Sequence, residues 1–180
     1  LYSHLDTRAE NEWQAVVKQI VGTWGRLDIL VNCAGVGGRR LDGSGVPKIE
    51  EQELEDWNRV MDVNSTGIFL GMKTAIPEMR KAGGGSIINI SSINATRPPA
   101  VAGAFAASKA ALEAWTLSAA RGFAPDIRVN AVRPGLVERD YNPRPQEVMG
   151  RFLKEVPLGR AGTPGDIAPA VGRVSPPDAA

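Results

Sequence analysis

The sequence is poor in the residues that build disulfides and metal centres. It contains one cysteine, Cys33, and one histidine, His4. A lone cysteine excludes an internal disulfide framework and fits a reducing compartment, so we expect a cytoplasmic protein. Cysteine and histidine do not recur at any spacing typical of a metal site. His4 lies at the start of the chain, and we assign it no catalytic role.

Long hydrophobic runs and an excess of one charge are also absent. No apolar run approaches the roughly 20 residues that a bilayer-spanning helix needs. Lysine and arginine number 21 against 20 acidic residues, so no overall field attracts nucleic acid or an anionic membrane. The basic pair Arg39-Arg40 is too short to form a nucleic-acid patch. We therefore predict neither nucleic acid nor a membrane as a partner.

The residues that are present form an ordinary globular composition. The 180 residues are 43% hydrophobic and 23% charged, which is typical of a folded domain. A chain of this length can bury a substantial core. We predict one domain over residues 1–180.

Apolar periodicity predicts helices that alternate with short buried strands. Thr7-x-x-Glu10 has the spacing of a capping box, and the helical stripe behind it ends at Gly22 and Gly25. A long helix is predicted from Leu54 to about Arg80, with a kink near Pro77. The other predicted elements are buried strands at 27–33, 86–90 and 127–132, and helices at 101–123, at 146–154 and from 164.

This alternation favours a parallel sheet with helices on both faces, an α/β fold of the doubly wound type. In such sheets ligands bind outside the carboxyl ends of the strands. Three loops lie there: Asn32–Gly35, Ser91–Ser92 and Pro134–Val137. Their glycine and small polar residues allow a ligand to approach the backbone closely. Strand-to-helix turns are also commonly rich in Gly and Ser without any ligand.

Two polar residues lie on apolar helix faces. Asn64 falls on the stripe that begins at Trp57, where an amide costs free energy unless it is hydrogen-bonded. Lys109 shares a helix face with Phe105 and Leu112. A core asparagine with satisfied hydrogen bonds, and a lysine whose ammonium snorkels to solvent, are the alternatives to functional roles.

Taken together, these features resemble the short-chain dehydrogenase/reductase family, from Asp6 to Asp166. Asn32-Cys33-Ala34-Gly35 is similar to the family's Asn-Asn-Ala-Gly turn, and Phe105-x-x-x-Lys109 is similar to its Tyr-x-x-x-Lys motif. The other matching segments are Asp62-Val63-Asn64, Asn89-Ile90-Ser91-Ser92, Arg128-Val129-Asn130, Pro134-Gly135, Pro157-Leu158-Gly159-Arg160 and Pro164-Gly165-Asp166-Ile167-Ala168.

The resemblance implies a three-layer, Rossmann-like doubly wound parallel sheet and an oxidoreductase. Such enzymes transfer a hydride between NAD(P) and a secondary alcohol or ketone. The implied catalytic positions are Asn64, Ser92, Phe105 and Lys109. In the family a tyrosine exchanges the proton, and a nearby lysine lowers its pKa from about 10. Ser92 would bind the substrate oxygen, and Asn64 would help to hold a water in a proton relay to Lys109.

The resemblance also implies partners for the site. Asp6 would lie near the adenine of the cofactor. The other implied cofactor-binding positions are Asn32, Ala34, Gly35, Lys109, Pro134, Gly135 and Val137. In the family, the residue that selects NAD or NADP follows a strand that this chain is expected to lack. The expected cofactor is therefore NAD or NADP, without a choice between them. The partners would be a small-molecule alcohol or ketone and, for the completed protein, further copies in a tetramer built on helices 54–80 and 101–123.

The sequence departs from the family pattern at several points. Phe105 stands where the family has its catalytic tyrosine, and Arg139 stands where a threonine often bonds the nicotinamide amide. No glycine-rich pyrophosphate loop precedes the first helix. We expect the first βαβ unit and the last strand to be absent, which would leave open sheet edges and an uncovered face. A catalytically silent member that binds a nucleotide or partner, and a non-functional fragment, are the alternative hypotheses.

Overall fold

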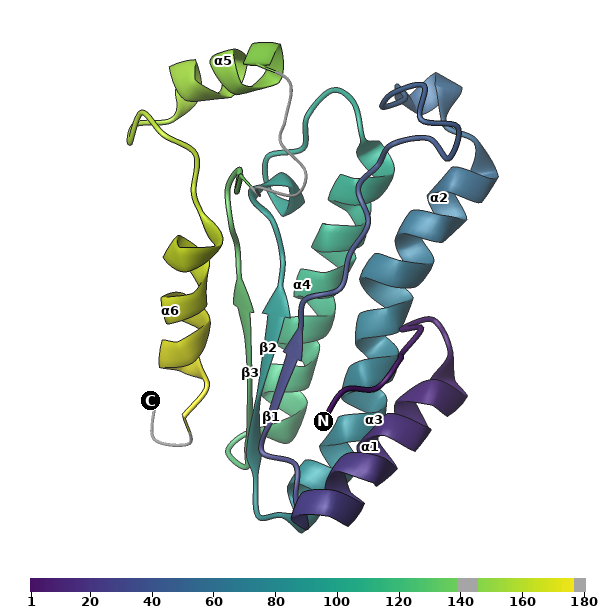
Figure 1. Cartoon of the computed structure of the whole chain (residues 1–180), viewed down its shortest axis with the longest axis vertical. Coiled ribbons are helices and arrows are strands. Elements are labelled where there is room, and N and C mark those ends of the chain that lie inside the picture. Colours follow the sequence, from purple (N-terminus) through teal and green to yellow (C-terminus); the bar gives the residue numbers. More distant parts are fainter. Residues whose placement is uncertain (139–145, 177–180) are drawn as a thin grey trace.

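The computed structural model describes residues 1–138 and 146–176. Helices and strands alternate through this part of the chain (Figure 1). In chain order the elements are α1 (Glu10–Trp24), β1 (Ile29–Asn32), η1 (Ile49–Glu51), α2 (Leu54–Met61), η2 (Asp62–Thr66), α3 (Gly67–Lys81), β2 (Gly85–Ile90), η3 (Ile93–Ala95), α4 (Gly103–Phe123), β3 (Ile127–Val132), α5 (Gln146–Glu155) and α6 (Pro164–Val174).

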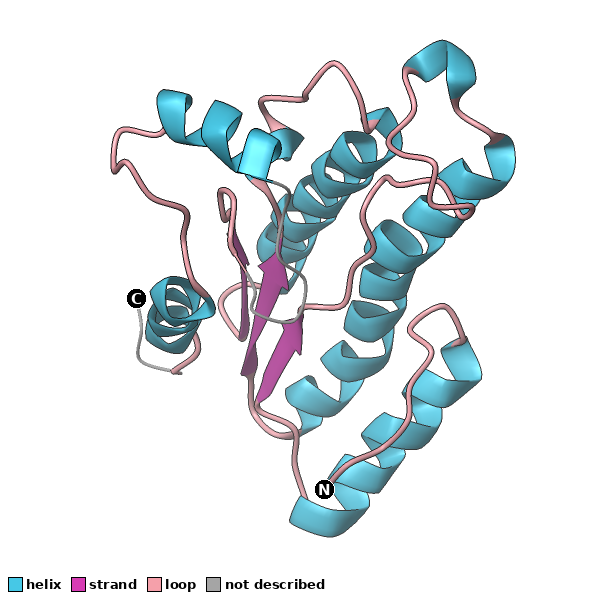
Figure 2. Ribbon diagram, turned by 45° about the horizontal axis from the view of Figure 1, so that its top comes forward, coloured by secondary structure: helices cyan, strands magenta, loops and turns pink. Residues whose placement is uncertain are grey.

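The three strands form one parallel sheet in the order β1-β2-β3. The central strand β2 is apolar and buried, with Ile87 and Ile88 fully covered. Helices α1, α3 and α4 lie on one side of the sheet, and α6 lies on the other (Figure 2). The predicted parallel α/β architecture, with the sheet between helices, is confirmed.

The core lies between the sheet and helices α1, α3 and α4. It is made of buried aliphatic and methionine side chains from all these elements: Val17, Leu27, Ile68, Met72, Ala75, Ile76, Met79, Ile87, Leu112, Ala119, Ile127 and Val129. Among the residues that the structure describes, no helix has the length and apolar character needed to cross a membrane.

Strand β1 corrects one prediction from the sequence. The run 27–33 was expected to be buried on both faces, but the strand covers only Ile29–Asn32, and Ile29 and Val31 are 43% and 42% exposed. The reason is the position of β1 at the sheet edge. Helix α6 contacts β2 and β3, so the outer face of β1 has no helix over it within the described residues. The expected open edge and uncovered face are therefore observed.

The start of α1 corrects another prediction. Ala9 is the N-cap, without a side-chain hydrogen bond, so Thr7 and Glu10 do not form a capping box. The Thr7 carbonyl instead accepts a hydrogen bond from the Trp13 indole at 2.9 Å. The predicted end is confirmed, because Gly25 adopts the left-handed conformation (φ 78°) that favours glycine after a helix.

The long helix predicted from Leu54 to Arg80 is interrupted. Helix α2 ends at Met61, a π turn covers Asp62–Thr66, and α3 continues through Pro77 to Lys81. A π turn accommodates one extra residue, and such turns are frequent at functional sites. Asn64 lies at the middle of this turn, so the irregularity coincides with the candidate site.

Close packing of α3 predicts a strong effect of one methyl group. A Cβ at Gly71 would lie 2.8 Å from Asn32 Oδ1 and 2.9 Å from Trp13 Cη2. We expect Gly71→Ala to lower the free energy of unfolding by about 1–3 kcal/mol through overpacking. The matched control is Gly122→Ala in α4, where no atom lies within 4 Å and helix propensity predicts a gain of up to about 1 kcal/mol. Urea denaturation measures both, and a stabilised Gly71→Ala protein would contradict this packing.

Candidate active site

The carboxyl ends of the three parallel strands meet at one edge of the sheet, the upper end in Figure 1. Two of the loops there are joined by backbone hydrogen bonds. Ser91 N donates to Val132 O at 2.8 Å, and Ile93 N donates to Pro134 O at 3.0 Å. The predicted loops Ser91–Ser92 and Pro134–Val137 therefore run side by side.

Asn64 joins the loop after β1 to the helices. Its Oδ1 accepts a hydrogen bond from Val36 N at 2.8 Å, and its Nδ2 donates to Val36 O at 2.9 Å. Nδ2 also donates to Ser108 Oγ on α4 at 3.1 Å. The side chain is fully buried, so it is a core asparagine with satisfied hydrogen bonds. Those bonds fix the loop after β1 against α4.

Lys109 lies in the same cluster. Its Nζ donates to the carbonyl oxygen of Ile90 at 2.7 Å, and only 5% of the residue is exposed. Burial lowers the pKa of Lys109 to about 8, while Cys33 nearby acts in the opposite direction. The ammonium does not snorkel to solvent. It is held at the carboxyl end of β2, beside the loop that carries Ser92.

Phe105 lies one helical turn before Lys109 on α4. The ring centroid is 5.9 Å from Lys109 Nζ. Ser108, on the intervening turn, donates to the Phe105 carbonyl at 2.8 Å. The i, i+4 spacing therefore brings the two side chains together as the sequence predicted. The phenylalanine ring offers the ammonium its face but has no hydroxyl to exchange a proton.

The two serines after β2 have different surroundings. Ser91 is buried, and its hydroxyl donates to Glu113 Oε1 at 2.6 Å. Ser92 is half-buried, and its Oγ accepts a hydrogen bond from Asn94 N at 3.2 Å at the start of η3. That contact uses one lone pair of Ser92 and leaves its hydroxyl proton available. The geometry thus favours Ser92 over Ser91 as the serine that meets a ligand.

The loop after β1 passes close to Asn64 and Lys109 at its glycine. A Cβ at Gly35 would lie 3.3 Å from Asn64 Oδ1 and 3.7 Å from Lys109 Nζ. Ala34 and Gly35 are exposed, whereas the Asn32 side chain is buried and donates to Asn89. A small, exposed backbone segment beside a lysine fits the ribose part of a dinucleotide. Contacts from Asn32 would come from its backbone.

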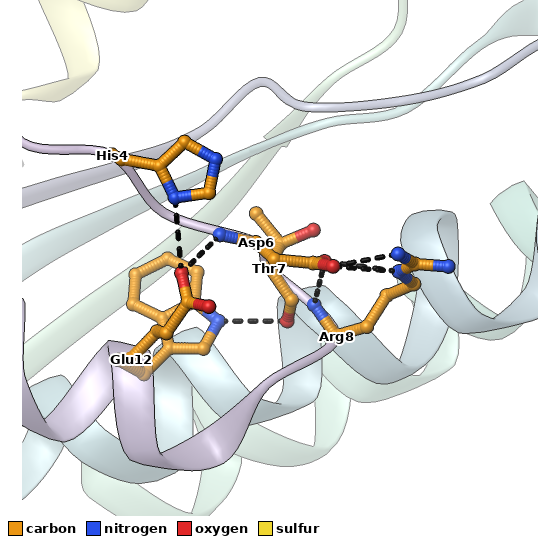
Figure 3. A network of polar contacts seen from close by, with 6 residues as sticks. His4, Asp6, Thr7, Arg8 and Glu12 are labelled. Atoms are coloured by element: carbon orange, nitrogen blue, oxygen red, sulfur yellow. Dashed lines mark hydrogen bonds and ion pairs between the residues drawn. The ribbon is translucent and has the colours of Figure 1, made fainter.

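Asp6 lies in a separate network before α1 (Figure 3). Both of its carboxylate oxygens accept from the Arg8 guanidinium, at 2.9 and 2.6 Å, and these hydrogen bonds hold the pKa of Asp6 down at about 2. Its backbone N–H donates to Glu12 at 2.7 Å. The next residue, Thr7, packs against Gly67 at the start of α3. This segment therefore borders the helix that follows Asn64.

The loop after β3 leads toward α6. Val137 pairs with Gly162 in a parallel bridge, and Gly162 N donates to Leu136 O at 2.9 Å. Pro134 accepts the hydrogen bond from Ile93, and Gly135 is exposed. Arg139, the expected departure near the nicotinamide, lies outside the described residues. In the ranges 1–138 and 146–176, no three His, Cys, Asp or Glu side chains are placed to hold a metal.

Sequence reasoning missed a buried polar chain beneath the site. Asn32 Nδ2 donates to Asn89 Oδ1 at 2.8 Å, and Asn89 Nδ2 donates to Thr116 Oγ1 at 2.9 Å. The parallel register, which pairs Asn32 with Asn89, makes this contact. The available signal was Asn89 itself, an amide near the end of an apolar strand.

Known proteins match this chain over nearly all of its length. The family model described as enoyl-(acyl carrier protein) reductase matches residues 2–174. The 3-alpha-(or 20-beta)-hydroxysteroid dehydrogenase of Mycobacterium bovis is 36% identical over 93% of this chain and 60% of its own length. The trans-4-hydroxycyclohexanecarboxylate dehydrogenase of Sinomonas cyclohexanicum is 40% identical over 89% of this chain and 58% of its own length.

A solved short-chain dehydrogenase/reductase from Serratia marcescens has the same fold. The TM-score is 0.86 at 36% identity, over 97% of this chain and 68% of that one. The chain spans about 60% of the length of the curated relatives it matches. The family model, the curated relatives and the solved structure agree on one assignment: the chain belongs to the short-chain dehydrogenase/reductase family of oxidoreductases.

Proposed function

We propose that this chain carries the substrate and nicotinamide side of an oxidoreductase that transfers a hydride between NAD(P) and a secondary alcohol or ketone. The observation that supports this most strongly is the cluster at the carboxyl edge. A buried lysine, a glycine loop and a serine with a free hydroxyl proton lie together there. The named activities of both curated relatives concern ring alcohols, so ring ketones are the first substrates to test.

Each proposed site residue has a role that its surroundings support. Ser92 donates its hydroxyl proton to the substrate oxygen. Lys109 supplies a positive charge beside position 105 and hydrogen bonds for the cofactor ribose. Asn64 holds the loop of Gly35 in place through its hydrogen bonds to Val36, and it would support the proposed proton relay to Lys109 through this loop.

The proposed cofactor contacts follow the same edge. Ala34, Gly35 and Lys109 would hold the nicotinamide ribose, and Pro134, Gly135 and Val137 would border the ring. Asp6 and the backbone of Asn32 would face the adenine side. When bound, NAD(P) would supply or accept the hydride, and the chain's own residues would orient the substrate oxygen, which gains a proton on reduction and loses one on oxidation.

Phe105 favours a second candidate function. Without a phenol, the site has no group at position 105 that can exchange a proton, although it keeps Lys109 and the loop of Gly35. The alternative is a member that binds a nucleotide or a partner without turnover. A third candidate is a non-functional fragment.

Binding and melting experiments separate these candidates. A version extended at both ends to the length of its relatives, with Phe105 kept, should bind NADH or NADPH by calorimetry. No binding of either would overturn the binding hypothesis and leave the proposed cofactor contacts unsupported. A cooperative thermal transition of the 180-residue chain would count against the fragment hypothesis.

For the extended protein we also propose a homo-oligomer built on the helices at 54–81 and 103–123. Their exposed apolar side chains support this. Trp115 is 42% exposed and contacts Phe69 in a tilted ring pair with centroids 5.2 Å apart, and Leu117 is 60% exposed. The molecular mass in solution tests it.

A further inference from the structure

The side chain of Glu113 joins three segments at the carboxyl edge of the sheet. It lies on α4, one helical turn after Lys109, and 17% of its side chain is exposed. Its Oε1 accepts from Ser91 Oγ at 2.6 Å, at the end of β2. The carboxylate also accepts two hydrogen bonds from the guanidinium of Arg133, just after β3. Nε donates to Oε1 at 2.8 Å, and Nη2 donates to Oε2 at 2.6 Å.

The hydrogen bonds to Glu113 are of the strong, charge-assisted kind. A bidentate guanidinium–carboxylate pair fixes orientation as well as distance. The hydrogen bond from the Ser91 hydroxyl to the carboxylate is 2.6 Å long, which is shorter than hydrogen bonds between neutral groups usually are. The pKa of Glu113 is held below its ordinary value, chiefly by the Arg133 hydrogen bonds. The carboxylate therefore stays charged and keeps its partners at neutral pH.

The partners of Glu113 are neighbours of the proposed site residues. Ser91 directly precedes Ser92, and Arg133 directly precedes Pro134. Because residues four apart lie on one helix face, Lys109 and Glu113 reach the same strand end. Lys109 bonds the Ile90 carbonyl, and Glu113 bonds the Ser91 hydroxyl. Two successive turns of α4 thus hold two successive residues before Ser92.

We propose that Glu113 is a positioning residue that fixes Ser92, Lys109 and the Pro134 loop relative to one another. It does not touch the reacting atoms and acts through Ser91 and Arg133. Its value for catalysis rests on the proposed function, whereas its clamping of the strand ends does not. Carboxylates that orient the ligands of metal sites cost about 10–100-fold in activity when they are lost, and we expect a loss of the same order here.

Amide hydrogen exchange tests the clamp in the 180-residue chain itself. Glu113→Gln should speed exchange at the amides of Ser91 and Ile93 by about tenfold, since their hydrogen bonds to the segment 132–134 lose support. The amide of Ser86, which bonds Asp28 at the opposite end of the sheet, should keep its rate. Equal acceleration at all three amides would indicate general destabilisation and overturn the proposal, as would no acceleration.

Turnover tests the catalytic consequence in the extended protein that carries Phe105→Tyr. Glu113→Gln should lower kcat by about 10–100-fold in a protein that still melts cooperatively and still binds the cofactor by calorimetry. The matched control, Glu78→Gln, removes a carboxylate that pairs with Lys81 on α3 and should leave kcat unchanged. An unchanged kcat in Glu113→Gln would overturn the positioning role. If the Phe105→Tyr parent shows no turnover, the proposed function fails, and the exchange experiment alone decides whether Glu113 clamps the strand ends.

Discussion

Phe105→Tyr should raise the rate of NAD(P)H-linked ketone reduction by about 10²–10⁴-fold in the protein extended to the length of its relatives. The variant adds a phenol where the ring already lies, 5.9 Å from the Lys109 ammonium. That positive charge favours the phenolate and lowers the pKa of the new tyrosine from about 10 toward neutrality. The phenol can then exchange a proton with the substrate oxygen. Steady-state rates on cyclic and aliphatic ketones measure the gain.

The matched control adds the same hydroxyl elsewhere. Phe69 contacts Trp115 at the outer side of α3 and α4, so Phe69→Tyr should leave turnover at the level of the parent. Equal rates for Phe105→Tyr and the parent, with both proteins folded and binding cofactor, would contradict a proton-exchange role for position 105.

Lys109→Met should stabilise the 180-residue chain at neutral pH, because burial lowers the pKa of Lys109 from 10.5 to about 8. Below pH 8 the folded chain holds a buried charge that the unfolded chain solvates freely. A pKa shift of this size corresponds to about 3 kcal/mol of destabilisation of the folded chain by the buried charge. Lys109→Met removes this cost but also loses the hydrogen bond to Ile90, which contributes about 1 kcal/mol. We expect Lys109→Met to be more stable than the parent by about 2 kcal/mol at pH 7.

The sign of the pH dependence is fixed by linkage. Between pH 8 and 10.5 the unfolded parent binds more protons than the folded parent, so the parent's stability rises with pH. The advantage of Lys109→Met should therefore shrink across this window. Urea denaturation at pH 7 and at pH 10 measures it, with Lys81→Met as the control for loss of one exposed lysine. A constant difference between parent and variant would rule out a buried, charge-destabilised Lys109.

The sequence predicts those parts of the fold that depend on local periodicity. The apolar run of β2 and the helix that carries Phe105 and Lys109 follow from spacing alone, and both are confirmed within one or two residues. The helix at 146–155 also agrees. Spacing places Phe105 and Lys109 on one face because four residues make about one helical turn.

Features that depend on register and on neighbours could not be predicted from the sequence. The Asn32–Asn89 bond requires the pairing of two strands that lie 57 positions apart. The π turn at Asn64 coincides with the contact of its amide with Val36, 28 positions away, and has no local propensity signal. The exposure of Ile29 arises because α6 covers β2 and β3 and not β1.

Ketone-dependent consumption of NADH or NADPH by the extended Phe105→Tyr protein is the most direct test of the central claim, that this edge of the sheet is a proton-transfer site for hydride transfer. The account predicts consumption with ring ketones, and a sharp loss of it in Ser92→Ala. A folded Phe105→Tyr protein that binds the cofactor but consumes none with any ketone of the panel would contradict it.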